Sequence, residues 1–393
     1  MNIYPLNIAS NQDINNICAL IKTDPRALAY LSPKSNILHF YAGNIDYRAA
    51  AFLKQELLSR GGDTIVTKHV IDGKSSSSNI LLMGTSSQIR SLIQKLSSMD
   101  CWGLKGLREG LSRSFSNMNI NKWQINSKIT LDNDNTKLTA IINLTQDSFY
   151  EGSRVNEADI INTAQKFLNE GAYILDIGAE STRPGAAQVD SSKEIAKLLP
   201  ALKLLRREFG EDIIISVDTY KAVTARAAVE SGADIINDIS GFSLDRDMIK
   251  TIAELNVPYI LSHIEGTPGN MQQYEGHENI INTLQDYFAE KINILVESGL
   301  KRENIILDPG LGFAKSGHDN FMIIKHIESL KSFGLPVMIG HSRKRFTGDK
   351  NELAGTLAVS SLLAGRVSLL RVHDVRENLL ALSVSKSIRE AKF

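Results

Sequence analysis

The sequence predicts a (β/α)8 barrel, the TIM barrel of the α/β class, preceded by a small α/β domain. From residue 138 onward, short apolar runs alternate with longer amphipathic stretches, and eight such units occupy roughly 250 residues, the usual size of this barrel. The runs are rich in Ile, Val and Leu and lack polar alternation, which is typical of strands buried on both faces of a parallel sheet. A doubly wound sheet is the alternative, but eight uniform units without a topological switch point favour a closed barrel.

Residues 1–118 lack this repeat and are predicted to form a separate domain, with the barrel occupying residues 119–393. The predicted elements of the first domain are a strand at 37–43, a helix at 50–62, strands at 64–71 and 79–85, and a helix at 87–99. The serine-rich stretch at 74–78 is expected to be a surface loop, and residues 117–122 a linker. This domain shows no carboxylate cluster, metal-ligand spacing or nucleotide motif, so we expect a structural or interactive role for it.

The barrel domain begins with a β-like segment at 122–132, which is predicted to form a hairpin that plugs the bottom of the barrel. The eight strands are predicted at 138–143, 173–178, 213–218, 234–238, 257–263, 305–309, 337–342 and 368–374. Amphipathic stretches between them are predicted to be helices, for example at 156–172, 192–210 and 278–299. Glycine often follows these stretches, as it does at the C-terminal ends of helices.

Composition excludes several classes of protein. The chain has 44 Lys and Arg against 44 Asp and Glu, so no overall field attracts nucleic acid or an anionic membrane. Its two cysteines, Cys18 and Cys101, are too few for a disulfide framework or a metal cluster, which suits the reducing cytoplasm. The first residues do not resemble a signal peptide, and no apolar run is long enough to span a membrane. We therefore expect a cytoplasmic protein that binds neither nucleic acid nor membrane.

Every predicted strand ends in a polar or charged residue. One such residue is usually a turn or cap residue, but the carboxyl ends of barrel strands meet at one mouth, where barrel enzymes place the active site. Eight converging polar ends therefore indicate a site. In strand order they are Asn143, Asp176, Asp218, Asn237 with Asp238, His263, Asp308, Ser342, and Arg371 with His373.

The chemistry of these residues suits a polar nitrogen heterocycle that carries an anionic group. Carboxylates and amides accept hydrogen bonds from ring N–H groups, and the cations on the last two strands lie where barrels often bind phosphate. The loops at 145–154 and 179–186 mix hydroxyls with a cation and are candidates to close over a substrate, although each alone also fits an ordinary surface loop. The glycine-rich stretch at 308–315 does not match a phosphate-loop motif. His263 is expected to be a satisfied core histidine.

Seven motifs follow one another across about residues 122–393: INLTQDSF, LDIGAESTRPGA, ISVDTYK, IINDISGF, ILDPGLGFAK, SRKRF and RVHD. Together, and in this order, they resemble the motifs of dihydropteroate synthase. The resemblance implies a transferase of folate biosynthesis, the target of sulfonamides. Such an enzyme joins 6-hydroxymethyl-7,8-dihydropterin diphosphate to p-aminobenzoate, releases dihydropteroate and pyrophosphate, and requires Mg²⁺. The resemblance also implies a homodimer.

The resemblance assigns roles to individual residues. The residues that match pterin contacts are Asp176, Asn237, Asp308 and Lys344, with Asp218 beneath the ring. Arg371 and His373 match the pair that binds the diphosphate, and Asn143 matches the Mg²⁺ ligand. Asp176, Lys344, Arg371 and His373 are therefore the expected catalytic residues.

Further residues match the second substrate and the second mobile loop. Phe313 and Ser342 match the p-aminobenzoate side, and the loop residues are Thr182, Arg183 and Pro184. The chain departs from the family pattern at Gln146, which replaces a usual Pro in the first loop, and at Ser262, which replaces a usual Met. The first departure leaves details of loop closure open.

The stretch GHSRKRF, residues 340–346, places three cations beside a buried strand, where an unpaired charge is costly. The family motif places Lys344 over the pterin, and Asp308 is its expected counter-charge. Arg343 is expected to pair with a nearby carboxylate, and Arg345 to be a solvated surface charge.

Two other functions compete with this one. A methyltetrahydrofolate-dependent methyltransferase would bind a pterin but needs a corrinoid partner, and the corrinoid-binding motif D-x-H-x-x-G is absent. It also needs no diphosphate site, whereas this chain has the SRKRF motif and the pair Arg371 and His373. A non-catalytic pterin-binding homologue is disfavoured because every position that the chemistry needs is retained.

Overall fold

The computed structural model describes residues 3–6, 8, 11–144, 150–151, 154–155, 157–180, 189–266, 276–348 and 353–391. The chain divides into two compact units, residues 1–116 with 390–393, and residues 117–389. We call them the N-terminal unit and the barrel unit. Gln146, Thr182, Arg183 and Pro184, which the sequence motifs single out, lie outside the described residues.

The N-terminal unit is a small α/β fold around an antiparallel sheet with the order β1-β3-β2. Its strands are β1 (Ile37–Asp46), β2 (Asp63–Ile65) and β3 (Ser77–Thr85), and its helices are α1 (Asn11–Ile21), α2 (Leu28–Ser35), α3 (Tyr47–Leu58), α4 (Ser86–Leu96) and α5 (Leu104–Asn117). A short 3-10 helix, Pro25–Ala27, precedes α2. Helix α4 starts with a capping box, in which the Gln88 side chain accepts a hydrogen bond from the Thr85 N–H at 2.7 Å. Leu53, Leu57, Leu82 and Leu92 are fully buried in its core.

Two predictions for this unit are wrong in detail. Strand β2 is shorter than the predicted strand at 64–71, because the chain turns after Ile65. The predicted loop at 74–78 includes Ser77 and Ser78, which belong to β3. Ser78 is buried, and its hydroxyl accepts a hydrogen bond from the Thr67 N–H at 2.9 Å, which explains why a serine is tolerated inside the strand.

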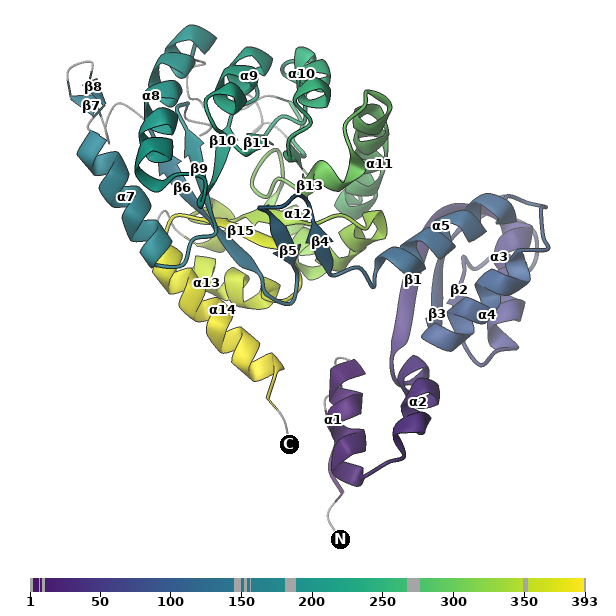
Figure 1. Ribbon diagram of the computed structural model, residues 1–393. Coiled ribbons are helices and arrows are strands. Elements are labelled where there is room, and N and C mark those ends of the chain that lie inside the picture. The colour runs from purple at the N-terminus through teal and green to yellow at the C-terminus, as the bar shows by residue number, and fades with distance from the viewer. Residues whose placement is uncertain are drawn as a thin grey trace. The chain divides into compact units, whose positions relative to one another are not determined.

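The barrel unit contains eight parallel strands surrounded by helices (Figure 1), as predicted. The strands are β6 (Lys137–Asn143), β9 (Ile174–Gly178), β10 (Ile214–Asp218), β11 (Ile235–Asp238), β12 (Tyr259–Ser262), β13 (Ile305–Asp308), β14 (Met338–Gly340) and β15 (Leu369–Val372). Their order is β13-β12-β11-β10-β9-β6-β15-β14, and a parallel bridge between Leu307 and Val337 closes the ring. The doubly wound alternative is therefore wrong.

Helices follow the strands and cover the outside of the barrel. They are α7 (Glu157–Asn169), α8 (Ser191–Phe209), α9 (Ala222–Glu230), α10 (Asp247–Leu255), α11 (Ile280–Glu297), α12 (Gly317–Lys325), α13 (Leu353–Leu363) and α14 (Val375–Arg389). The 3-10 helices Arg302–Asn304, Ile327–Phe333 and Arg345–Thr347 lie in the connections, as do the two-residue strands β7 (Tyr150–Glu151) and β8 (Arg154–Val155). Alternate strand residues such as Leu175, Ile177 and Val217 pack outward in the core that the strands share with these helices.

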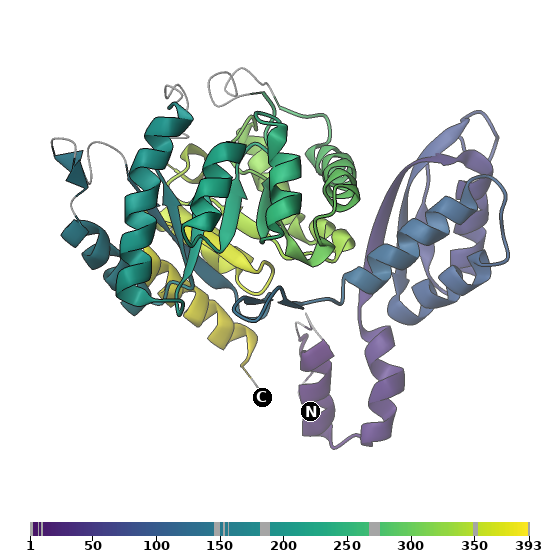
Figure 2. The ribbon, with the colours of Figure 1, turned by 45° about the horizontal axis from the view of Figure 1, so that its top comes forward.

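The hairpin of β4 (Lys122–Gln124) and β5 (Thr130–Asp132) plugs the bottom of the barrel, as predicted (Figure 2). Its Ile125, Ile129 and Leu131 pack against a ring of inward-facing residues at the amino ends of the strands. We call this ring the floor; its members are Ile174, Ile214, Ile235, Ile260, Ile306, Met338 and Leu369. The floor and the hairpin fill the lower half of the barrel with buried apolar side chains.

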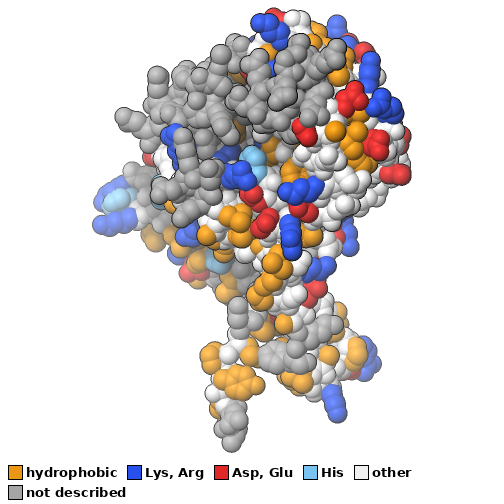
Figure 3. Space-filling view, turned by 90° about the vertical axis from the view of Figure 1, so that its left-hand side faces the viewer, with side chains coloured by type: hydrophobic (Ala, Val, Ile, Leu, Met, Phe, Trp, Pro, Cys, Tyr) orange, Lys and Arg blue, Asp and Glu red, His pale blue; other side chains and the backbone are white. Residues whose placement is uncertain are grey.

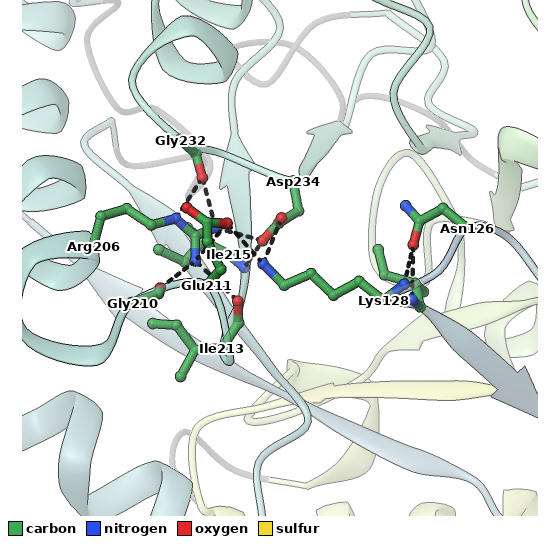
Figure 4. A network of polar contacts seen from close by, with 10 residues as sticks. Asn126, Lys128, Arg206, Gly210, Glu211, Ile213, Ile215, Gly232 and Asp234 are labelled. Carbon is green, nitrogen blue, oxygen red and sulfur yellow. Dashed lines mark hydrogen bonds and ion pairs between the residues drawn. The ribbon is translucent and has the colours of Figure 1, made fainter.

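A polar network holds the hairpin in place (Figure 4). Asp234, just before β11, accepts hydrogen bonds from Lys128 Nζ at 2.8 Å, from Arg206 Nη2 at 2.6 Å and from the Ile215 N–H at 2.7 Å. Arg206 of α8 also donates to the carbonyl oxygen of Gly232, at 2.9 Å from Nε. One carboxylate therefore joins the hairpin to α8, β10 and β11.

The surface of the described part of the chain carries charges of both signs. On the face shown in Figure 3, basic and acidic side chains lie close to one another. None of the helices in the described ranges combines the length and the apolar character that crossing a membrane requires.

Candidate active site

The inside of the barrel changes from apolar to polar two residues above the floor. Side chains of a strand alternate in direction, so the next inward residue follows the floor residue by two positions. At seven strands this next residue is polar or glycine. In strand order these residues are Asp176, Ser216, Asn237, Ser262, Asp308, Gly340 and Arg371. The upper half of the barrel is therefore a polar mouth on an apolar base.

Arg371 crosses the mouth and pairs with two carboxylates. Its Nε lies 2.6 Å from Asp176 Oδ2, and its Nη2 lies 2.6 Å from Asp218 Oδ2. These contacts connect β15 with β9 and β10. The side chain of Asp176 is fully buried, whereas that of Arg371 is 18% exposed, so the guanidinium lies between the interior and the opening.

Burial and neighbouring charges shift the pKa values of this group. Burial raises the pKa of Asp218 to about 7; the Arg371 guanidinium opposes this rise and the Asp176 carboxylate adds to it. Burial alone would lower the pKa of Arg371, but Asp176 and Asp218 raise it above its usual value. The guanidinium therefore stays positively charged, whereas Asp218 is a carboxyl that can change its charge near neutral pH.

Several buried polar atoms around the guanidinium have no hydrogen-bond partner within the described residues. They are Asp176 Oδ1, Asn237 Oδ1, Ser216 Oγ and Thr139 Oγ1. Unsatisfied buried acceptors are costly, and a cluster of them in a mouth indicates a place for a ligand with N–H groups. Asn237 Nδ2 also donates to Asp176 Oδ2 at 3.2 Å, which fixes the orientation of the Asp176 carboxylate.

The structure also brings Lys344, Phe313 and Asp308 together. Lys344 Nζ lies 4.2 Å from the centre of the Phe313 ring and donates a hydrogen bond to the Leu311 carbonyl. Burial lowers the pKa of Lys344 to about 8, and the charge of Asp308 opposes this. Burial raises the pKa of Asp308, and Lys344 in turn opposes that rise. Asp308 therefore acts as an electrostatic partner of Lys344, as predicted.

The other two cations of GHSRKRF have the surroundings expected from the sequence. Arg343 Nη2 lies 2.5 Å from Asp374 Oδ1, so this arginine pairs with a carboxylate at the end of β15. Arg345 is exposed. Only Lys344 of the three is directed into the group that contains Asp308 and Phe313.

Ser342 and His373 form a second contact at the mouth. Ser342 Oγ lies 3.1 Å from His373 Nδ1, and the same oxygen accepts a hydrogen bond from the His373 N–H at 3.2 Å. The residues follow the neighbouring strands β14 and β15. They lie on the same side of the barrel as Arg371, the preceding inward residue of β15.

Two residues at strand ends turn out to be structural. Asp238 faces away from the mouth and accepts hydrogen bonds from Tyr259 Oη at 2.6 Å and from the Phe242 N–H at 2.8 Å. His263 is fully buried, and Lys315 Nζ donates to its Nδ1 at 2.9 Å. Burial lowers the pKa of His263 to about 2, so it stays neutral and is the satisfied core histidine that the sequence predicts.

The sequence reasoning missed some polar residues of the mouth. Ser216 and Thr139 lie inside strands, and the only signal for Ser216 was its place two residues after a floor residue. Glu180, which precedes residues 181–188, is held by Tyr220 Oη at 2.9 Å and by Lys221 Nζ. Lys221 also lies 2.9 Å from Glu194. This network fixes the start of the loop after β9.

Comparison with known proteins agrees with this geometry. Residues 139–373 match the family described as pterin binding enzyme. A dihydropteroate synthase of Clostridium beijerinckii is 38% identical over 274 residues, which cover 67% of this chain and 98% of that protein. A solved structure of Xanthomonas albilineans dihydropteroate synthase with 4-aminobenzoic acid has 32% identity and a TM-score of 0.62, covering 70% of this chain and 100% of that one.

Some relatives are longer or have a second named activity. A Helicobacter pylori bifunctional dihydropteroate synthase/dihydropteroate reductase is 32% identical over 383 residues, covering 95% of this chain and 96% of that protein. The chain spans only about a third, 34%, of the folic acid synthesis protein fol1 of Pneumocystis carinii, with 40% identity over 255 residues, or 62% of this chain. The family match and the coverage of the shorter relatives establish that the chain belongs to the pterin binding enzyme family and, within it, to the dihydropteroate synthases.

Proposed function

We propose that the barrel unit joins 6-hydroxymethyl-7,8-dihydropterin diphosphate to p-aminobenzoate, the reaction of dihydropteroate synthases. The observation that carries this proposal is the buried Asp176 carboxylate, whose Oδ1 has no partner within the described residues and lies among other unsatisfied acceptors. The N–H groups of a pterin would satisfy these atoms. The cations Arg371 and Lys344 beside them suit a ligand that also carries negative charge.

The reaction is a substitution at the methylene carbon of the pterin. The bond between this carbon and the diphosphate oxygen breaks, and the electron pair leaves with the diphosphate. The amine nitrogen of p-aminobenzoate forms the new C–N bond and loses a proton. Dihydropteroate and pyrophosphate are the products, and the protein supplies no covalent nucleophile.

The residues of the mouth would act on the charges that develop in this step. An ionised Asp176 beside the ring favours the cationic pterin over the neutral ground state. Arg371 and His373 would bind the diphosphate and stabilise its growing negative charge. Lys344 would lie along the ring face, with its ammonium near the ring carbonyl. Phe313, which already contacts Lys344, and Ser342, which contacts His373, would line the slot for p-aminobenzoate.

Asn143 is the proposed ligand for Mg²⁺, and the residues around it fit that ion. A side chain at Gly178 would place its Cβ 3.7 Å from Asn143 Oδ1 and 3.9 Å from Asp218 Oδ2, so glycine leaves a space between two oxygen donors. Mg²⁺ prefers oxygen ligands and takes few from the protein when it also binds substrate phosphates. When bound, it would neutralise charge on the diphosphate.

A turnover assay tests the proposal. The protein is mixed with pterin diphosphate, p-aminobenzoate and Mg²⁺, and both dihydropteroate and pyrophosphate are measured. We expect equal amounts of the two products, each dependent on both substrates. Pyrophosphate release that does not depend on p-aminobenzoate would instead identify a hydrolase, and absence of both products in folded protein would refute the proposal.

We also propose that the chain forms a homodimer through α13 and α14. Leu380 and Val384, one turn apart on α14, are 66% and 51% exposed, and Leu362 of the adjacent α13 is 60% exposed. Adjacent exposed apolar side chains of this kind mark interaction surfaces. Sedimentation of wild type and of Val384→Asp tests this, because a charge at the interface should produce a monomer. Identical monomeric sedimentation of both proteins would refute it.

A second activity, the reduction of dihydropteroate, is a candidate because of the full-length match to the Helicobacter pylori protein. This chain covers 96% of that bifunctional protein, which leaves almost no other sequence there for its reductase. The reaction would add a hydride to a ring carbon and a proton to the adjacent nitrogen, with a nicotinamide as hydride donor. Dihydropteroate-dependent oxidation of NADPH or NADH by the full chain tests it. No oxidation above that of the cofactor alone would contradict it.

A further inference from the structure

The two carboxylate oxygens of Asp176 differ in the hydrogen bonds that they accept. Oδ2 lies 2.6 Å from Arg371 Nε and 3.2 Å from Asn237 Nδ2, and both nitrogens donate to it. A carboxylate oxygen accepts about two hydrogen bonds, so Oδ2 is saturated. Oδ1 is buried and has no hydrogen-bond partner within the described residues. A ligand with two parallel N–H groups therefore finds one oxygen open and the other taken.

Of the two groups on Oδ2, Arg371 is the one that can leave. Asn237 is only 2% exposed, and its short side chain is fixed on β11. Arg371 has a long, flexible stem and is 18% exposed. The next inward residue of its strand is His373 at the opening. A rotation of the Arg371 stem toward His373 would carry the guanidinium out of the pterin position to the place proposed for the diphosphate.

We propose that Arg371 is a specificity residue with two positions, on Asp176 and Asp218 in the empty site and on the anionic tail when a pterin diphosphate binds. This inference rests on the proposed function and deepens it. A phosphate group offers the guanidinium a two-point contact that replaces the one it gives up. The uncharged alcohol, 6-hydroxymethyl-7,8-dihydropterin, must displace the guanidinium without offering a new partner. The site therefore selects against a pterin that has not been activated.

The pairing of Arg371 with Asp176 and Asp218 sets what the movement costs. Departure of the guanidinium leaves Asp176 and Asp218 without their shared cation, and two buried carboxylates repel one another. A ligand must therefore offer the guanidinium a contact that replaces both carboxylates. The anionic tail of the pterin diphosphate does so, and the uncharged alcohol does not.

Calorimetric titration of the wild type and of Arg371→Gln tests the inference. The ligands are the pterin diphosphate, the pterin alcohol and pyrophosphate. Because the variant loses charge-assisted hydrogen bonds, its affinity for the pterin diphosphate should fall by about 100-fold. The alcohol should bind about fivefold tighter or better, because its competitor for Asp176 is gone. If Arg371 only contacted phosphate, its replacement would leave the affinity for the alcohol unchanged. An unchanged or a weaker affinity for the alcohol would overturn the inference.

His373→Gln is the matched control. His373 is also proposed to bind the diphosphate, but it follows the strand and contacts Ser342 rather than Asp176. This variant should bind the pterin diphosphate more weakly, but its affinity for the alcohol should not increase. If both variants bind the alcohol more tightly, the cause is the loss of positive charge and not the release of Asp176. That result would overturn the proposed exchange of Arg371 between its two positions.

A measurement on the wild type alone covers the case in which Arg371→Gln does not fold. Pyrophosphate should draw the guanidinium away from Asp176, so pyrophosphate and the alcohol should each raise the other's affinity by the same factor, about fivefold. Independent or mutually weakened binding would overturn the exchange while leaving the proposed function intact. Failure of the wild type to bind either the alcohol or the diphosphate would instead refute the proposed function.

Discussion

Lys344 Nζ lies 4.2 Å from the centre of the Phe313 ring, and the same nitrogen donates to the carbonyl of Leu311. Lys344 follows β14, whereas Phe313 and Leu311 follow β13. The contact therefore ties together two neighbouring loops of the mouth. Burial lowers the pKa of Lys344 to about 8, so the cation that joins these loops loses its charge at a pH only slightly above neutral.

Lys344→Ala should impair pterin-diphosphate binding and turnover together. The variant loses the cation and leaves the buried Asp308 without its electrostatic partner. We expect the dissociation constant to rise by about 10- to 100-fold, as for the loss of a charge-assisted hydrogen bond. Arg345→Ala is the control, because Arg345 is exposed and should be replaceable with little effect. Unchanged Lys344→Ala beside an impaired Arg345→Ala would reverse our interpretation of GHSRKRF.

Binding of the pterin diphosphate should weaken as the pH rises through about 8. Lys344 is charged below its pKa of about 8 and neutral above it, and the charged form is the one that attracts the ligand. Unfolding does not explain such a loss. The unfolded lysine keeps its proton up to about pH 10.5, whereas the folded one loses it near pH 8. The contribution of this group to the free energy of unfolding therefore increases as the pH rises from 8 to 10.5.

The measurement is the dissociation constant at a series of pH values, in wild type and in Lys344→Arg. The guanidinium keeps its charge throughout this range. The weakening near pH 8 should therefore disappear in the variant. If it persists, another group causes it.

Asp176→Asn should abolish most of the turnover. The substitution keeps the size of the side chain but removes the negative charge that stabilises a cationic ring. We expect the rate to fall by about 100- to 1000-fold, similar to the loss of one preorganised electrostatic contact in other enzymes. Single-turnover rates measure this, and the circular dichroism spectrum checks the fold. A normal rate in Asp176→Asn would show that the carboxylate has no role in the chemistry.

Asp234→Ala should destabilise the barrel without changing the mouth. It leaves Lys128 and Arg206 without the carboxylate they share, and the side chains of Arg206 and Asp234 are 11% and 15% exposed. Loss of one partner from a buried charge pair costs about 3–5 kcal/mol in the free energy of unfolding. Urea denaturation measures this, and ligand binding below the transition should be normal.

Glu211→Ala is the control for that prediction. Glu211 lies 3.5 Å from the same Lys128, but it is 82% exposed. An exposed ion pair of this kind contributes less than about 1 kcal/mol. Equal losses of stability in the two variants would mean that burial of Asp234 is not what gives the network its strength.

A chain that begins at residue 117 should retain the synthase reaction. The barrel unit contains every described residue proposed for this reaction, and the Clostridium beijerinckii relative aligns over 98% of its length with 67% of this chain. Product formation by the shortened protein, measured against the full chain, checks this. If reductase activity is found in the full chain and lost in the shortened one, the N-terminal unit is required for it. Loss of the synthase in folded, shortened protein would show that the N-terminal unit is catalytic.

The strands of the barrel were predictable because burial on both faces leaves continuous apolar runs such as IIISVD. Their polar ends were predictable for the same reason, since Asp176 or Asp308 stands out after such a run. The contacts across the mouth were not. Arg371 reaches Asp176 because β15 pairs with β6, the strand next to β9, and because an arginine side chain is long enough to pass over β6.

Residues with a weak sequence signal were missed. Thr139 and Ser216 lie within strands, where hydroxyl side chains are ordinary. In the structure, their hydroxyl oxygens are buried and have no hydrogen-bond partner among the described residues. The short β2 was predicted too long because the residues after Ile65 include Val and Ile, which favour strands. There the backbone follows turn hydrogen bonds, such as that from the Val70 N–H to the Thr67 carbonyl at 3.1 Å.

The barrel divides into a lower part, the floor and the hairpin, that stabilises the fold, and an upper part, the mouth, that is proposed to carry the chemistry. Ile129 of the hairpin is fully buried against the floor, and two residues above the floor the side chains are those of the mouth. A mutation in the floor can therefore be neutral for catalysis, and a mutation in the mouth can be tolerated when the floor holds stability in reserve. For a protein engineer, the hairpin and the floor are the places to add heat resistance before altering substrate choice. For a lineage under selection by an inhibitor of the mouth, the same separation supplies a route to resistance.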